Sequence, residues 1–172
     1  LSDLDVSLSL QSDKGSLDSD IYIIIDSLDE FIYKGKLNLN HFNLDLFKNK
    51  FGIKEVYGEI NVEGKGIDIL SFDTEIVGNL NYVNIAGRTY DNLVLNGRLQ
   101  PNYFKGEAWL TDDDLELDFS GEVDFSKDKP VMDFVSNVVE ADLVKLNLYN
   151  KEPVISLIGS YQGKASTEIF LE

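Results

Sequence analysis

The chain of 172 residues contains no cysteine, one histidine, one tryptophan and three prolines. Without cysteine, neither disulfide bonds nor thiolate metal sites can form. The single histidine, His41, has no nucleophile motif such as G-x-S-x-G to act on, which disfavours a Ser-His-Asp hydrolase. We therefore expect a protein that is not an enzyme and needs no cofactor, with His41 at the surface.

Long apolar runs are missing as well. The longest covers residues 21–25 and includes Tyr22, whereas a bilayer-spanning helix needs roughly 18 residues or more. No signal peptide is recognisable. Because the chain starts and stops inside alternating patterns, we interpret residues 1–172 as a single β-rich segment cut from a longer, repetitive protein.

Basic residues are scarce relative to acidic ones. Fifteen Lys and Arg stand against 31 Asp and Glu, which gives a formal net charge of -16. A field of this sign repels phosphate backbones and anionic headgroups. We therefore expect neither nucleic acid nor an electrostatically bound membrane surface as a partner.

What the sequence does contain is strict alternation of apolar and polar residues, most clearly over residues 90–126. Side chains two residues apart share one face of a strand, so this stretch predicts three strands with an apolar face and a polar face. The residues that we expect on the apolar face, apart from its glycines and Ala108, are Leu93, Leu95, Leu99, Phe104, Leu110, Leu115, Leu117, Phe119, Val123 and Phe125.

The connections between these three strands are short and consist of turn-forming residues. Pro101 and Asn102 join the first pair, and Asp112, Asp113 and Asp114 join the second. Links of this length make antiparallel neighbours, because parallel strands need a long crossover. No long amphipathic helix is predicted that could cover the apolar face. The sheet must therefore curl, pack on a second sheet, or hold something apolar.

The same alternation recurs along the rest of the chain and predicts an all-β fold of about ten strands. We expect a curved antiparallel meander that forms an open, taco- or gutter-like groove or a half-closed sandwich. Two short helical or irregular inserts, at residues 42–47 and 141–146, interrupt the pattern. The terminal segments 4–10 and 155–169 contain no proline, so we also expect edge-to-edge self-association.

Three motifs resemble ligand sites only in part. Residues 159–165 fall one residue short of a phosphate loop and end in alanine. Asp112, Asp114 and Glu116 have calcium-loop spacing but lack its glycine and its final glutamate. A third set, Glu116, Asp118, Glu122 and Asp124, lies on the polar face, opposite the apolar one. Nothing there would bury a carboxyl group and raise its pKa, as a glycosidase requires. We predict a plain strand, a hairpin turn and a solvated polar face, and no metal site.

Taken together, several pieces resemble the TamB-like members of the AsmA-like envelope proteins, in the form found in Bacteroidetes. They are Y-x-N-L-x-L-x-G-x-L from Tyr90 to Leu99, F-x-G at Phe104, L-x-L-D-F-x-G from Leu115 to Gly121, D-F-S at Asp124 and A-D-L-x-x-L at Ala141. The resemblance runs from about Phe31 to about Ser166.

The resemblance implies a segment of a periplasmic rod that bridges the inner and outer membranes. In such proteins an apolar gutter is thought to carry phospholipid acyl chains, which makes the ten apolar residues named above lipid-facing. It also implies an inner-membrane anchor and an outer-membrane barrel partner, both through regions outside this segment. The alternative is a self-contained β-sandwich for adhesion or glycan binding, which Trp109 on the polar phase of its strand supports.

Overall fold

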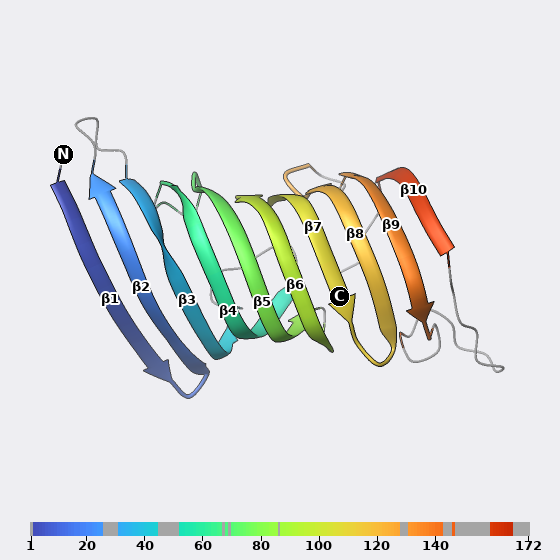
Figure 1. Ribbon diagram of the computed structural model, residues 1–172, viewed down its shortest axis with the longest axis horizontal. Coiled ribbons are helices and arrows are strands. Elements are labelled where there is room, and N and C mark those ends of the chain that lie inside the picture. The colour runs from blue at the N-terminus through green and yellow to red at the C-terminus, as the bar shows by residue number, and fades with distance from the viewer. Residues whose placement is uncertain are drawn as a thin grey trace.

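The structure is a computed structural model that describes residues 2–25, 31–44, 52–66, 68, 70–85, 87–127, 131–142 and 146, and the backbone of 159–166. These residues form one ten-stranded sheet in which the strands follow each other in chain order (Figure 1). Every neighbouring pair is antiparallel. The prediction of an all-β, curved antiparallel meander is confirmed, and the sheet is open.

The strands are long, and the hairpins between several of them are tight. Their bounds are β1 Ser2–Ser12, β2 Gly15–Ile25, β3 Phe31–Asn43, β4 Ile53–Lys65, β5 Asp73–Ile85, β6 Arg88–Gln100, β7 Tyr103–Thr111, β8 Leu115–Asp124, β9 Val131–Ala141 and β10 Gly159–Ser166. Asn102 adopts a positive φ of 59° in the turn after Pro101, a conformation that asparagine tolerates better than most residues.

The inserts differ in part from the prediction. Phe42 and Asn43 belong to β3 rather than to an irregular segment, and residues 45–47 lie outside the described residues. The change of period there comes from a register shift between Leu39 and Phe42, because a bulge moves the following side chains to the other phase. In the second insert, the Leu146 N–H donates to the Asp142 carbonyl over 2.9 Å, and residues 143–145 lie outside the described residues.

The register aligns the apolar positions of all strands on one face, which we call the apolar face. Residues directly opposite each other in an antiparallel pair point to the same side. One row across the sheet therefore consists of Leu10, Leu17, Leu39, Gly58, Leu80, Leu93, Leu110, Leu117 and Val138. The next row consists of Leu8, Ser19, Leu37, Ile60, Gly78, Leu95, Ala108, Phe119 and Ser136.

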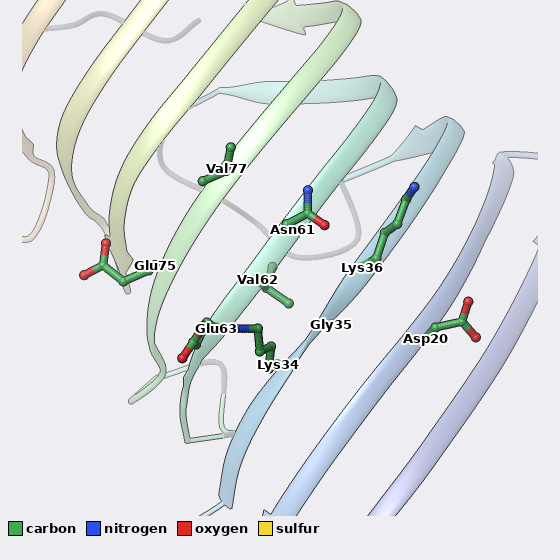
Figure 2. A pocket seen from close by; sticks show the side chains of 9 residues that line it. All are labelled: Asp20, Lys34, Gly35, Lys36, Asn61, Val62, Glu63, Glu75 and Val77. Carbon is green, nitrogen blue, oxygen red and sulfur yellow. Dashed lines mark ion pairs between the residues drawn. The ribbon is translucent and has the colours of Figure 1, made fainter.

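Strands β3 to β6 bend sharply near one end, and we call this bend the corner. His41 in β3 and Asn92 in β6 both have a φ of 52°, and Gly58 in β4 has a φ of 150°. The register also shifts between Tyr57 and Gly58. Figure 2 shows neighbouring strands turning back at this end. Bulges and positive-φ residues bend strands in this way, so each of these strands has a long arm and a short arm.

The best-buried apolar cluster lies inside the corner. Its members are Leu39 and Leu80 from the long arms and Val56 and Val83 beyond the bend, and Val83 is only 1% exposed. Ile60 and Leu95 of the apolar face pack against the same cluster. The short arms therefore fold over the apolar face, which makes this face the concave one.

We expect Leu80→Ala to lower the free energy of unfolding by about 2–4 kcal/mol, because it leaves a cavity in the packed corner. Leu4→Ala makes the same chemical change on β1, where the side chain is 50% exposed, and should cost less than about 1 kcal/mol. Urea denaturation of both variants measures the two values. Equal losses would contradict the placement of the core at the corner.

Candidate binding face

The strand register places nine of the ten candidate residues on one face. Leu93, Leu110 and Leu117 are opposite one another, as are Leu99, Phe104 and Val123. Leu95 and Phe119 are separated by Ala108 in the intervening row. Leu115 pairs with Ala141, and Phe125 follows the end of β8, where its N–H donates to the Asn102 carbonyl over 2.7 Å. Strands β6 to β8 thus bring the nine residues that lie within them together on the apolar face.

Most of this face is only half-buried. Of the ten residues, Leu110 is buried at 8% exposure, and the other nine are intermediate. Within the described residues, every strand belongs to the one sheet and none forms a second layer against it. The short arms cover the apolar face only at the corner, so away from the corner it keeps an accessible surface.

The apolar face extends beyond the residues that the sequence singled out. Phe134 in β9 stacks on Phe119 with ring centroids 5.8 Å apart and an interplanar angle of 23°. Ile60 and Ile76 continue the face through β4 and β5. The same period of two was present in these segments, and tracing it from strand to strand would have included them.

A band of glycines runs across the middle of the apolar face. Gly97, Gly106 and Gly121 are direct neighbours on β6, β7 and β8. A Cβ atom on Gly106 would lie 2.3 Å from the Asn96 carbonyl oxygen and 2.6 Å from the Gly97 Cα. Only glycine fits there, because the obstacle is backbone. The floor of the concave face therefore has no side chain of its own at these three positions, and the Phe104 ring lies over Gly97, 3.0 Å from where a Cβ would stand.

We expect Gly106→Ala to destabilise the protein by about 1–3 kcal/mol, because neighbouring backbone must shift to admit the methyl group. Gly78, also mid-strand on the apolar face, is the matched control. A Cβ there would meet its nearest atom, on the Ile60 side chain, at 3.6 Å. Gly78→Ala should be neutral or stabilise slightly, since it restricts the unfolded chain. Thermal unfolding compares the two, and the reverse order would contradict this account of the band.

The opposite, convex face carries the charges. Lys34 pairs there with Glu63 at 2.7 Å and Lys105 with Glu122 at 3.4 Å. The Arg88–Asp114 pair, at 2.7 Å, lies instead on the inner side of the short arms, because Arg88 is opposite Ile85, which packs against the corner cluster. A shallow depression of about 560 Å³ opens on this face (Figure 2). Asp20, Lys34, Lys36, Glu63 and Glu75 line it. The lysines already pair with carboxylates, Lys36 with Glu59, which leaves the depression poorly suited to capture an anion.

His41 lies on the outer side of the corner, and its side chain is 59% exposed. Its Nδ1 is 3.0 Å from a Glu55 carboxylate oxygen, and the Tyr82 hydroxyl contacts both groups. Burial, helped by the adjacent Glu55 carboxylate, raises the pKa of Tyr82 to about 12. The Tyr82 hydroxyl in turn lowers the pKa of Glu55. The expected surface position of His41 is confirmed, and its neighbours are two tyrosines, Tyr82 and the stacked ring of Tyr57 at 5.3 Å, and a carboxylate.

The partial motifs have structural roles. The Asp112 carboxylate accepts the backbone N–H groups of Asp114 and Asp91, each at 3.0 Å, and so shapes the predicted hairpin turn. Gly159 and Lys164 both lie in β10. In the part of the chain that the structure describes, no group of three or more His, Asp or Glu residues could hold a metal ion. Nor do the described residues include a helix long and apolar enough to cross a membrane.

The Asp73 carboxylate accepts hydrogen bonds from Arg98, including one of 2.6 Å from Nε. These bonds lower its pKa from 3.8 to about 2. Because the pKa of Asp73 is lower in the folded state than in the unfolded chain, the pairing stabilises the fold fully at pH values above 3.8. This stabilisation is lost as the pH falls through about 2. In Arg98→Gln we expect the Asp73 pKa, measured by NMR titration, to return towards 3.8. An unchanged midpoint would refute the pairing.

Comparison with protein-family models, curated proteins and solved structures found no match to this chain.

Proposed function

We propose that the apolar face is a groove that holds the acyl chains of phospholipid, in a segment of a periplasmic bridge between the inner and outer membranes. The observation that carries this proposal is the continuity of the apolar face over the sheet, together with its half-exposed side chains. A contiguous apolar surface that stays exposed is typical of a binding site.

The dimensions suit an acyl chain. Neighbouring strands lie about 4.8 Å apart, so nine steps across ten strands give an apolar path of roughly 43 Å. One leaflet of a bilayer has a hydrocarbon depth of roughly 15 Å, half of the ~30 Å core. A fully extended acyl chain can therefore lie along the groove with room to move between strands.

Most of the ion pairs are placed so that they do not compete with such a ligand. The ion pairs of Lys34 and Lys105 lie on the convex face, and the glycine band, flanked by the Phe104 and Phe134 side chains, offers a chain a low, apolar floor. The acidic convex face repels anionic headgroups, so the protein binds lipid by apolar contact and not by charge.

The wider setting of the proposal comes from the resemblance to TamB-like proteins. In that setting the segment is a non-enzymatic part of a translocation and assembly module that supports phospholipid transport and outer-membrane biogenesis. An inner-membrane anchor and a barrel partner in the outer membrane would act through regions outside residues 1–172.

Native mass spectrometry of the purified protein should detect co-purified phospholipid, and a fluorescent fatty-acid probe should bind. Leu95→Asp places a carboxylate in the groove and should weaken probe binding at least about tenfold, because a charged group disfavours an apolar ligand. Val94→Asp is the matched control: it is the preceding residue and lies on the convex face at 37% exposure. It should leave binding unchanged. Equal effects, or no binding by the parent protein, would refute the groove.

Leu117→Asp separates an open groove from a dry core. In a closed core the buried, unpaired charge would cost several kcal/mol. Because Leu117 is only half-buried, we expect a loss of about 1–2 kcal/mol in the free energy of unfolding, with impaired probe binding. No effect on either property would mean that the two faces are assigned the wrong way round.

One observation favours adhesion or glycan binding as a second candidate. Trp109 is 37% exposed on the convex face, directly opposite Val94, and exposed aromatic rings often stack on sugars. A glycan array tests this candidate. Binding that Trp109→Ala abolishes, in a protein that binds no lipid probe, would replace the groove by a glycan site.

A further inference from the structure

The convex face has a second depression, of about 580 Å³, beside the outer side of the corner. Ion pairs line the depression described above, whereas amides dominate this one: Asn38 and Asn40 from β3, and Asn79 and Asn81 from β5. Strand β4 runs between them and contributes Tyr57. The volume falls within the roughly 300–1,000 Å³ that is usual for small-molecule sites.

A row of polar side chains crosses this depression. The row consists of Asp18, Asn38, Glu59 and Asn79, each directly opposite the next on the neighbouring strand. Side chains placed opposite one another have Cβ atoms about 4.5–5.5 Å apart. A single ligand lying across the strands can therefore contact several of them at once.

Two bulges at the corner add the remaining amides. On β3, Asn40 and His41 stand against Tyr57 alone. On β5, Asn81 is the extra residue between the partners of Tyr57 and Gly58. Bulges re-aim side chains next to binding sites, and here the register sets one amide on either side of Tyr57.

The Tyr57 ring is held in place by its neighbours. It stacks on His41 with ring centroids 5.3 Å apart and an interplanar angle of 17°, and the Tyr82 ring lies 5.9 Å away. The Glu55 carboxylate contacts both His41 and Tyr82, which fixes these two rings. Tyr57 is still 40% exposed. The corner thus presents a pre-oriented aromatic ring beside the amides, and pre-orientation reduces the entropy lost on binding.

The lining offers many hydrogen-bonding groups and little unpaired charge. Glu59 pairs with Lys36, while Asp18 has no cationic partner among the described residues. Nor do the side chains of the four asparagines form a hydrogen bond with another described residue. Each of these amides offers two N–H donors and one carbonyl acceptor.

We propose that this depression binds a neutral oligosaccharide. A sugar hydroxyl, like that of serine, donates one hydrogen bond and accepts two, so neighbouring hydroxyls match the donor and the acceptor of one amide. The C–H groups of a sugar ring pack on the electron-rich face of an aromatic ring, which Tyr57 supplies. Asp18 can accept further hydroxyls, and the net charge of -16 disfavours anionic ligands.

This site is separate from the other two candidate sites. The lipid groove lies on the opposite face of the sheet, and the sugar site does not depend on it. In the direction of Trp109, the amide row ends at Asn79, because the next residue opposite is Val94, whose side chain forms no hydrogen bond.

NMR titration with cellotetraose, maltotetraose and tetra-N-acetylchitotetraose tests the proposal. At least one of these neutral probes should shift the side-chain amide signals of the four asparagines saturably. The affinity should not change with salt, because the probes carry no charge for salt to screen.

Aromatic variants locate the stacking surface. Tyr57→Ala should weaken binding about 3- to 10-fold, the equivalent of one aromatic contact, whereas Tyr57→Phe keeps the ring and should bind within about twofold of the parent. Trp109→Ala is the matched control, since Trp109 is similarly exposed, at 37%, on the same convex face. It should leave the affinity unchanged.

Amide variants keep the test valid if Tyr57→Ala disturbs the corner, because they change exposed side chains. Asn38→Ala and Asn79→Ala should each weaken binding about 3- to 10-fold through lost hydrogen bonds. Asn96→Ala makes the same change on the convex phase of β6, outside the depression, and should have no effect.

Three results would overturn the proposal: no saturable shift with any of the three probes, equal effects of Tyr57→Ala and Trp109→Ala, or equal effects of Asn79→Ala and Asn96→Ala. Binding of spermidine alone, abolished by added salt, would also overturn it and would indicate a cation site at Asp18. The fatty-acid probe should not displace the sugar, so the sugar site and the lipid groove can fail separately.

Discussion

The antiparallel backbone ladder is the constraint on which the rest of this structure depends. Within the described residues the sheet has no second layer, so a slip of one residue in any pair would move that strand's apolar side chains to the charged face. The long unbroken registers of β1 with β2 and of β6 with β7 and β8 prevent this. They keep the leucine rows continuous, and the ion pairs on the convex face, such as Lys34–Glu63, reinforce the same alignment.

The corner is where the sheet acquires a core. A single curved layer can only half-bury its apolar side chains, and full burial requires contact from the other side. By folding the short arms over the apolar face, the bulges bring Val56 and Val83 onto Leu39 and Leu80. Stability and accessibility are thus divided: the corner is packed, while the face away from it keeps apolar surface that a ligand could cover.

Much of this fold was predictable from the period of two, because that period reports directly which side chains share a face. The three strands of residues 90–126 and the common face of Leu95, Leu117 and Phe119 follow from it. The corner was not predictable in the same way. A bulge adds one residue and changes the phase, so the pattern at Phe42 resembled an insert. The close approach of backbone at Gly106 depends on the neighbouring strand, as does the contact between His41 and Tyr82, which are 41 residues apart in the chain.

The identity between strand order and chain order has a consequence for how the protein folds and how it can vary. Each strand needs only its sequence neighbours, so contacts are local, and folding can start at the corner and propagate outwards hairpin by hairpin. Cooperativity should then decline with distance from β3–β6. An architecture of this kind can gain or lose a hairpin at its margin without repacking a shared interior, so its length can change in evolution more easily than that of a closed sandwich.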